Sequence, residues 1–326
     1  MLPLLHPLPD LRERVWGGSR LGPPRRLPIG EAWLAGPDSV IAAGPDAGST
    51  FAQLAARDGS ALVGRRAASR TGGRFPLLAK LIDPTAWLSV QVHPDDDLAR
   101  RLEGPDAVGK TEGWYVIDAE PDAALLLGVR DEVGEADVRA AITAAGDGAS
   151  DGATTGGRAP LVAPLLRRRR PVADGGFFVP AGALHAIGPG VFVYELQQAS
   201  DITYRCEDWG RPNTRARPLH TANALAAIAL DRPAGETPPS PAARTMPFAC
   251  EHFALERIRL AAGEHLTLEP AGLSLHIVTA LGPVAVRGTA GGTTLAALET
   301  VVVPAGWPAY TLSGPGATSV LVARIP

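Results

Sequence analysis

Lysine, cysteine and long apolar runs are scarce in this sequence, and each scarcity excludes a class of protein. Lysine occurs only at Lys80 and Lys110 among 31 basic residues, and 34 acidic residues bring the net charge to −3, so no general basic field would attract nucleic acid or a membrane surface. No apolar stretch approaches the roughly 20 residues that a membrane-spanning helix needs. Cys206 and Cys250 lie in no metal-ligand spacing and are too few for a disulfide framework, which indicates reduced thiols and a cytoplasmic protein.

The two lysines carry information because almost every other basic residue is arginine. A lysine kept in such a background indicates a position that requires a compact ammonium group rather than a planar guanidinium. The arginine run 167–170 is the one basic cluster, and we interpret it as a solvated loop or helix end rather than a nucleic-acid patch.

Glycine and proline are abundant, with 37 and 31 residues, and they favour a mainly β fold with many turns. Two short strands are predicted within 75–93, a hairpin within 114–129, and further strands within 176–206. Helical spacing predicts helices at 131–145 and 219–230, and the Gly/Ser/Thr-rich stretch 146–158 is expected to form a loop. From residue 253 onward the pattern is β throughout.

The chain is predicted to contain two units. Residues 232–243 hold four prolines and are the expected linker between residues 1–231, with a helical and loop insertion at about 130–170, and residues 244–326. A short echo, VPAGALH at 179–185 and VPAGWPA at 303–309, indicates two related β units of which only the first carries a histidine at this place. Chance is the alternative, because Pro-Ala-Gly arises easily in this composition.

Polar residues suited to metal binding occur at the ends of apolar runs. Gln91 and His93 are two apart and would share a face of a strand, and His185 follows the first Pro-Ala-Gly turn. Glu112 would likewise share a face with Lys110. Two imidazoles, one carboxylate and the Gln91 amide make a candidate site for zinc with an open position, or for non-haem iron(II).

A second pair, Asp201 and Arg205, is four residues apart and would share a face if both lie on one strand. Structural interpretations stay open at this point for every candidate. Lone histidines are commonly hydrogen-bonded core residues, and Asp201–Arg205, like Lys110–Glu112, could be an ordinary ion pair. The carboxylates of residues 95–97 are expected to form a turn and a helix cap.

Eight segments of the chain resemble the type I phosphomannose isomerases in their shorter bacterial form. They follow the family order through most of the first 225 residues, and the QVHPDD, KTEGW and SDITYR stretches are the most specific in combination. The segments are VWGGSRL (15–21), IGEAW (29–33), FPLLAKLID (75–83), LSVQVHPDD (88–96), GKTEGWYV (109–116), FFVPAGALHAIGPG (177–190), ELQQASDITYR (195–205) and RPLHTANAL (217–225).

The resemblance implies a cupin fold with two jelly-roll β-barrels, a metal-bearing catalytic one followed by one without a metal site. It also implies one zinc ion per chain and a substrate site beside it. The zinc ligands carried over are Gln91, His93, Glu112 and His185. The substrate-binding and catalytic residues carried over are Lys110, Asp201 and Arg205.

The reaction implied is the interconversion of mannose 6-phosphate and fructose 6-phosphate, a step of mannose metabolism. A proton leaves C2 of the open-chain aldose and arrives at C1 through a cis-enediol. Lys110 and Arg205 would place positive charge near the oxyanion or the phosphate, and Asp201 or a metal-bound water would be the base. Two rival hypotheses are a cupin dioxygenase that uses iron and a non-catalytic sugar-binding cupin.

Overall fold

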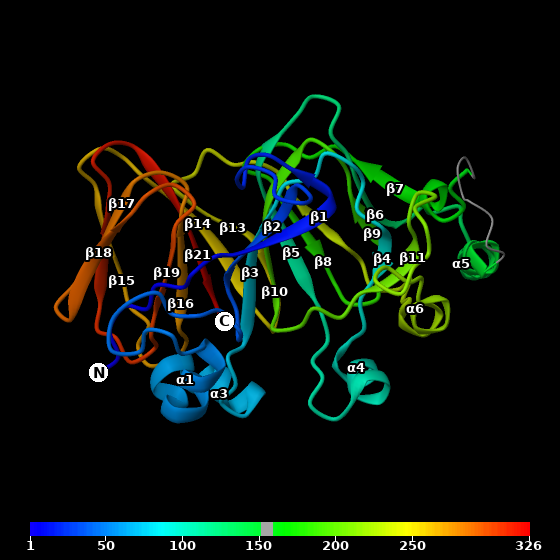
Figure 1. Cartoon of the computed structure of the whole chain (residues 1–326). Helices are drawn as coiled ribbons and strands as arrows, with labels where there is room; N and C mark the ends of the chain where they lie inside the picture. The colour runs from blue at the N-terminus through cyan, green and yellow to red at the C-terminus, as the bar shows by residue number, and fades with distance from the viewer. Residues whose placement is uncertain (151–158) are drawn as a thin grey trace.

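The computed structural model describes residues 1–150 and 159–326 of the chain. They form two β units that stand side by side, and the C-terminal unit runs from yellow through orange to red in Figure 1. Each unit consists of two antiparallel sheets and neither is a closed barrel. The prediction of a mainly β chain is confirmed.

The first unit pairs a seven-stranded sheet, ordered β1-β2-β3-β10-β5-β8-β12, with a five-stranded sheet, ordered β11-β4-β9-β6-β7. The apolar side chains between them come from both sheets: Trp114 and Val193 from the larger, Leu125 and Ile187 from the smaller. The strands are β1 (Asp10–Gly18), β2 (Ile29–Ala35), β3 (Leu77–Ile82), β4 (Val90–Val92), β5 (Glu112–Ala119), β6 (Leu125–Val129), β7 (Leu166–Arg169), β8 (Gly176–Val179), β9 (His185–Ile187), β10 (Val191–Gln198), β11 (Tyr204–Glu207) and β12 (Gly235–Thr237).

The second unit is built from a five-stranded sheet, ordered β13-β14-β21-β16-β19, and a four-stranded sheet, ordered β15-β20-β17-β18. The prediction of β structure throughout this part is confirmed. Its strands are β13 (Arg244–Ala249), β14 (Ala254–Leu260), β15 (His265–Leu268), β16 (His276–Ala280), β17 (Val284–Gly288), β18 (Gly291–Leu295), β19 (Thr300–Val303), β20 (Tyr310–Ser313) and β21 (Thr318–Arg324).

Short helices cover the ends of the sheets. The predicted helices at 131–145 and 219–230 are confirmed as α5 and α6, but α5 continues through part of the stretch expected to be a loop, and residues 151–158 of that stretch lie outside the described residues. No helix in the described part of the chain is long and apolar enough to cross a membrane. The helices are α1 (Phe51–Asp58), α2 (Ser60–Val63), α3 (Arg65–Thr71), α4 (Asp96–Glu103), α5 (Glu135–Ser150), the 3-10 helix η1 (Ala163–Leu165) and α6 (Thr221–Ala227).

The predicted hairpin within 114–129 is wrong. Its two strands exist, as β5 and β6, but β5 pairs with β8 and β10 whereas β6 pairs with β7 and β9 in the facing sheet. A turn signal shows where the chain reverses, but both strands are largely buried and find their partners far along the sequence. The chain therefore crosses from one sheet to the other at 120–124.

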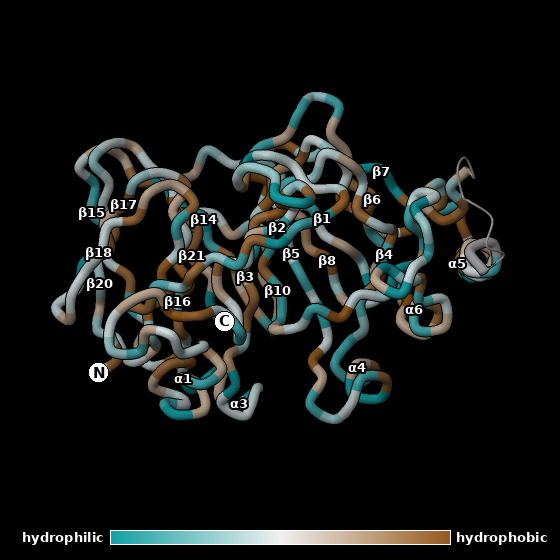
Figure 2. Tube along the Cα trace, in the orientation of Figure 1, coloured by the Kyte–Doolittle hydropathy of each residue, from teal (hydrophilic) through white to brown (hydrophobic). Residues whose placement is uncertain are grey.

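Helices α1–α3, which the pattern analysis missed, tie the two units together. The amides of Arg65 and Arg66 donate to the carbonyls of Gly272 and Leu273, each at 3.0 Å. One hydrophobic cluster includes residues of these helices and of both units. Figure 1 places α1 and α3 below the junction, and in Figure 2 hydrophobic segments gather along the strands of both units.

The linker segment 232–243 contains β12, which pairs with β8 at the edge of the larger sheet. On its far side, β13 begins the C-terminal sheet. The division into a catalytic unit at 1–231 and a second unit at 244–326 stays a prediction.

The contact between the units at Gly113 generates a stability prediction. A Cβ placed on Gly113 would lie 2.6 Å from the ring of Phe248, which is buried. We expect Gly113→Ala to lower the free energy of unfolding by about 1–3 kcal/mol, because overpacking displaces the ring and its neighbours.

Denaturant unfolding measures this change, with Gly235→Ala as the matched strand control, since its Cβ would meet only Phe178 at 3.4 Å. If the two variants have the same free energy of unfolding, the ring of Phe248 moves aside without destabilising the protein, and the prediction is wrong.

Candidate metal centre and active site

Three strands of the first unit bring the predicted metal ligands to one point. β4 pairs with β9 so that Gln91 lies directly opposite His185, and His93 follows β4 by one residue. Glu112 begins β5 in the facing sheet. One donor atom from each of His93, Glu112 and His185 lies within 4.8 Å of the others, and the three side chains are buried. This is the only such cluster of His, Cys, Asp and Glu found among the described residues.

Both imidazoles are fixed by backbone carbonyls. The Nδ1 atom of His93 lies 2.8 Å from the carbonyl oxygen of Ile202, and that of His185 lies 2.9 Å from the carbonyl oxygen of Ala183. A carbonyl only accepts hydrogen bonds, so each Nδ1 carries the proton and each Nε2 keeps its lone pair. Each Nε2 lone pair is therefore on the side of the ring that faces Glu112, where it can bind a metal ion.

The donor set fits a divalent metal. The Nε2 atoms of His93 and His185 lie 3.3 Å from Oε2 and Oε1 of Glu112 respectively. Ligand bonds of about 2.1 Å in a tetrahedron give donor separations of about 3.4 Å. Burial, helped by the Lys110 ammonium, lowers the pKa of His93 to about 3 and also lowers the pKa of His185, so both rings stay neutral. Neutral imidazole is the form that binds metal.

Gln91 lies beside this triad. Its Nε2 atom is 3.2 Å from Nε2 of His185, while Ser89 Oγ donates to its Oε1 at 3.2 Å. Rotating the amide by 180° exchanges the two atoms and would turn the oxygen, the atom a metal requires, toward His185. Direct ligation by Gln91 stays a prediction.

Glu112 is fully buried, and its hydrogen-bond donors are the Lys110 ammonium and the Trp114 indole. Burial alone would raise its pKa, but the charge of the Lys110 ammonium holds the pKa of Glu112 well below its usual range. The Lys110 ammonium contacts Oε2 of Glu112 and lies 3.0 Å from Nε2 of His93. The indole of Trp114 donates to Oε1 of Glu112 at 3.1 Å. Lys110 and Glu112 thus lie on one side of the chain, as their spacing predicts, and their ion pair is buried in the site rather than exposed at the surface.

The acidic pair of QVHPDD has two structural roles, and Asp96 holds the irregular segment before β5 that carries Lys110. Asp95 caps helix α4 by accepting from the amide of Leu98 at 2.9 Å, which confirms the predicted cap. Oδ1 of Asp96 accepts from the amide of Gly109 at 2.7 Å and from Nε2 of Gln198 at 3.0 Å. The other end of the Gln198 amide accepts from the backbone of Thr111 at 2.9 Å. The backbone is thus fastened on both sides of Lys110.

A cavity of about 280 Å³ opens beside the metal triad. Gln91, Lys110, Asp201 and Arg205 all line it, so the predicted substrate residues come together. The expectation that Asp201 and Arg205 share one strand is wrong, because β11 begins at Tyr204 and Asp201 lies in the preceding loop. The loop places Asp201 3.5 Å from Nζ of Lys80, across the cavity.

Five further charged residues that pattern analysis did not assign to this cavity line it: Arg14, Glu31, Lys80, Glu195 and Arg217. The Lys80 ammonium lies 3.2 Å from Oε1 of Glu195 and over the ring of Trp33 at 4.8 Å. Burial would lower the pKa of Lys80, but Glu195 and Glu31 raise it above its usual value. The Lys80 ammonium therefore stays charged although it is almost fully buried.

The carboxylate of Glu195 is linked to the metal triad through Trp114. Trp114 Nε1 lies 3.0 Å from Oε2 of Glu195, so one indole bridges Glu195 and Glu112. Burial and the Glu112 carboxylate raise the pKa of Glu195. Glu31, Glu112 and Glu195 with Lys80 and Lys110 make three carboxylates and two ammonium groups, a formal charge of −1 before a metal binds.

The chain matches known proteins over most of its length. It is 38% identical over 241 residues to the probable mannose-6-phosphate isomerase GmuF of Bacillus subtilis, a match that covers 70% of each chain. It is 36% identical over 241 residues, 70% of this chain and 69% of the relative, to the mannose-6-phosphate isomerase of Streptococcus mutans. The family model for the type I phosphomannose isomerase catalytic domain matches residues 13–114.

The chain belongs to the type I phosphomannose isomerases. The crystal structure of mannose 6-phosphate isomerase from Bacillus subtilis superposes with a TM-score of 0.78 at 26% identity, covering 99% of both chains. This agreement extends through the second unit and confirms the cupin fold. As a type I phosphomannose isomerase, the chain is an enzyme of a metal-dependent family.

Of the cavity residues that pattern analysis missed in this phosphomannose isomerase, Lys80 could have been found from the sequence. Lys80 was conspicuous as one of two lysines, and both of them line the cavity. Glu31 and Glu195 gave no comparable signal, because each lies within a strand of otherwise apolar or uncharged residues that reads only as core.

Removing one imidazole tests the metal triad. We expect His185→Ala to lose most bound metal, because a pre-formed site loses one of its donors, while the chain keeps its far-UV circular dichroism. Metal content by mass spectrometry after dialysis measures the change.

His276→Ala is the matched control, since His276 is also buried on a strand but hydrogen-bonds to Tyr310 in the second unit. Unchanged metal in His185→Ala would refute the ligand assignment.

Proposed function

We propose that this enzyme interconverts mannose 6-phosphate and fructose 6-phosphate with one zinc ion per chain. The observation that carries the proposal is the buried His93–Glu112–His185 triad beside a cavity lined by ammonium and guanidinium groups. The names of the relatives supply the substrate. A metal triad alone fits several reactions, but the cations beside it suit an anionic sugar.

Zinc would be held by His93, Glu112 and His185, with Gln91 as the fourth ligand. When bound, it supplies a Lewis acid for the substrate carbonyl and for the negative charge that develops on oxygen. Lys110, within contact of this triad, adds positive charge close to the same oxygen atoms. Arg205 also lines the cavity, on β11 opposite Gln91, and as a permanent cation it contributes to charge stabilisation as well.

We assign the proton transfer between C2 and C1 to Asp201. Its carboxylate is half-exposed at the cavity and faces the Lys80 ammonium, so it can reach a bound substrate. Glu195 is the other carboxylate at hand, but it is buried and engaged by both Lys80 and Trp114. We therefore assign Glu195 to positioning these two side chains.

The alternative of an iron dioxygenase uses the same two-histidine, one-carboxylate set. The cavity argues for the isomerase, because five cationic side chains line it: Arg14, Lys80, Lys110, Arg205 and Arg217. The residues that would serve catalysis are all present, which disfavours a non-catalytic sugar-binding cupin. We further propose that the enzyme works in the cytoplasm on a small sugar phosphate, without nucleic acid or membrane partners.

A coupled assay tests the reaction and the metal together. We expect the purified enzyme to form fructose 6-phosphate from mannose 6-phosphate without oxygen, to lose this activity on chelation and to regain it with zinc. Restoration of turnover by iron(II) alone would overturn zinc as the metal, and oxygen consumption without formation of fructose 6-phosphate would favour the dioxygenase. No turnover with metal still bound would exclude mannose 6-phosphate as substrate.

Paired carboxylate variants test the proton transfer. We expect Asp201→Asn to lower kcat by about 10²–10⁴-fold with metal content unchanged, because the amide cannot accept the proton. Incorporation of deuterium from solvent into the product should fall in proportion. Glu195→Gln is the matched control and should retain more of kcat. The reverse order of the two variants would move the base to Glu195.

A further inference from the structure

The first unit is open along one side. Its smaller sheet ends at β7 and its larger sheet ends at β12, and no strand pairing among the described residues joins these two edges. A cavity of about 370 Å³ lies at this opening, lined by Arg167 and Arg169 of β7 and by Gly235 and Glu236 of β12. We call it the seam cavity. It shares no described lining residue with the cavity beside the metal triad.

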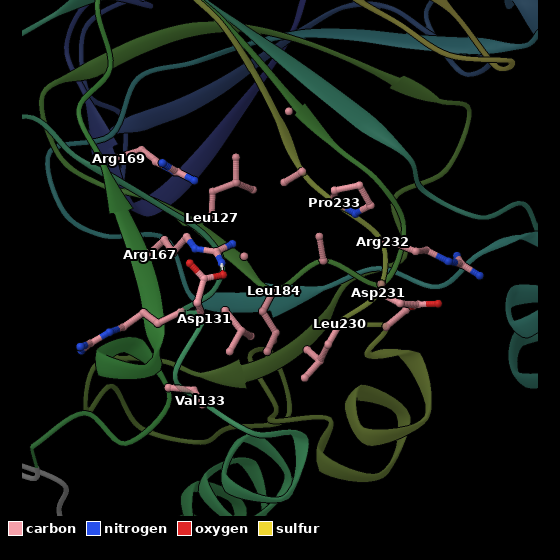
Figure 3. Close-up of a pocket in the computed structure, with 18 of the residues that line it drawn as sticks. Leu127, Asp131, Val133, Arg167, Arg169, Leu184, Leu230, Asp231, Arg232 and Pro233 are labelled. Carbon is pink, nitrogen blue, oxygen red and sulfur yellow. Dashed lines mark hydrogen bonds and ion pairs between the residues drawn. The ribbon is translucent and has the colours of Figure 1, made fainter.

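Aliphatic side chains form part of the lining of the seam cavity. Leu127 and Leu184 are almost fully buried, whereas Leu230 remains 37% exposed. Figure 3 shows these three side chains around the cavity, with Pro233 nearby. An aliphatic group of a ligand would therefore meet an apolar surface here and would remove Leu230 from water.

Three of the four arginines that line the seam cavity already have carboxylate partners. In Figure 3, Arg167 and Arg169 extend from β7 toward the middle of the cavity, whereas Asp231 and Arg232 turn away from it. The pairs are Arg130 with Glu132 at 2.8 Å, Arg167 with Asp131, and Arg232 with Asp95 at 2.9 Å.

Arg169 and Glu236 are the two charged residues of the edge strands that stay unpaired. Arg169 is half-buried and Glu236 is exposed, and neither side chain has a hydrogen bond or ion pair with residues 1–150 or 159–326. Glu236 lies opposite Phe177 in the pairing of β12 with β8, and Phe177 packs between the two sheets. Directly opposed residues share a face, so Glu236 lies on the inner face of its sheet. Opposite charges thus stand on the two edges of the opening without meeting.

The lining indicates the chemistry of a ligand. A carboxylate would suit Arg169, because a guanidinium holds it through two parallel N–H bonds. An ammonium group would suit Glu236, and an aliphatic group would suit the leucines. Aliphatic α-amino acids carry all three groups, and the volume lies within the roughly 300–1,000 Å³ of small-ligand pockets. A sugar would instead leave both charges without a counter-charge and place hydroxyl groups against leucine.

The seam cavity is connected to the metal triad through the turn that precedes His185. Gly182, Ala183 and Leu184 line the cavity. The carbonyl of Ala183 accepts a hydrogen bond from Nδ1 of His185 at 2.9 Å, and the amide of Gly182 donates to the carbonyl of His93 at 2.9 Å. The same short turn therefore borders the cavity and holds both metal-binding histidines.

We propose that the seam cavity binds an aliphatic α-amino acid as an effector, and that this ligand tightens the metal site through residues 182–184. A ligand packed on this turn restrains the carbonyl that orients His185, so less freedom is lost when the metal binds. By linkage, the metal raises the affinity for the amino acid by the same factor. The coupling rests on the proposed metal-dependent function, whereas binding of the amino acid does not.

L-leucine is the probe, titrated calorimetrically into the chelated protein so that the site is measured without metal. Two analogues each lack one charged group: 4-methylpentanoate has no ammonium and 3-methylbutylamine has no carboxylate. We expect L-leucine to bind best and 3-methylbutylamine to bind worst. The reason is that Arg169 is the less exposed of the two charged partners, so its ion pair is less screened by water.

Two variants assign the charged groups. Arg169→Met should weaken binding of L-leucine and of 4-methylpentanoate by about 10- to 100-fold, as expected for loss of a charged hydrogen bond, and should leave 3-methylbutylamine unaffected. Glu236→Gln should weaken L-leucine by only about 2- to 5-fold, because an exposed ion pair contributes little, and should leave 4-methylpentanoate unchanged.

Arg170→Met is the matched control, because it removes an exposed arginine next along the chain that does not line the cavity, and it should bind all three probes like the wild type. Thermal melting verifies that each variant is folded. The site is overturned if the wild type binds no L-leucine, if Arg169→Met binds it like the wild type, or if 3-methylbutylamine binds as well as L-leucine.

Competition with a chelator of known affinity measures the coupling. We expect saturating L-leucine to raise the zinc affinity of the wild type by about 5-fold or more. Arg169→Met should keep the zinc affinity that the wild type has without L-leucine and should lose the increase. Equal zinc affinity of the wild type with and without L-leucine would overturn the effector role.

Turnover of mannose 6-phosphate is scored separately. A wild type that isomerises the sugar but binds no L-leucine would refute this inference and keep the proposed function. A wild type that binds L-leucine through Arg169, but neither binds zinc nor isomerises the sugar, would refute the proposed function and the coupling and keep the amino-acid site.

Discussion

The site depends on one buried carboxylate, that of Glu112. It comes from the larger sheet and meets two imidazoles, one of them on a strand of the smaller sheet, so it lies where the two faces of the cupin unit converge. A carboxylate with no solvent exposure is expensive unless opposite charges and hydrogen bonds surround it. Lys110 and Trp114 provide part of that compensation, and a divalent metal would provide the rest.

The same requirement extends to the other charges in the cavity. Trp114 joins Glu112 to Glu195, Glu195 joins Lys80, and Lys80 reaches Asp201 at the opening. Each charged group is stabilised by the next. Removing any one of them would therefore leave a buried charge without its partner, which costs more free energy than truncating an apolar side chain. Such a network restrains the side chains before substrate arrives, which is what stabilisation of developing charge demands.

Sequence analysis predicted the local parts of this arrangement and missed the long-range ones. Gln91, His93, Lys110 and Glu112 became candidates because each lies in a short segment whose spacing predicts a shared face, and the family resemblance of those segments implied their roles. Glu195 could not, because its role arises only when β10 pairs with β5, with Glu195 opposite Trp114, a register between segments about 80 residues apart. The wrong hairpin at 114–129 has the same origin, since local turn chemistry does not determine which sheet receives the next strand.

Helices α1–α3 were missed for a different reason. They are short, and α2 and α3 begin after glycines, so the usual sequence signals for a helix start are weak there. Helix α1 does carry such a signal, the capping box of Thr50 and Gln53, which the pattern analysis overlooked. The three helices are held in place instead by backbone contacts to Gly272 and Leu273 of the second unit. The position of these helices therefore depends more on packing against the second unit than on the helix propensity of their own residues.

The place of β21 has a consequence for how the protein is made. This last strand lies at the centre of the C-terminal sheet, between β14 and β16, and its Leu321 and Ala323 belong to the hydrophobic cluster that also contains Phe51 and Tyr194 of the first unit. The core that joins the two units is thus complete only after β21 has left the ribosome. Although His93, Glu112 and His185 all precede β21 by more than a hundred residues, the nascent chain must keep apolar surface unburied until β21 has been made, a condition under which chaperones protect folding chains.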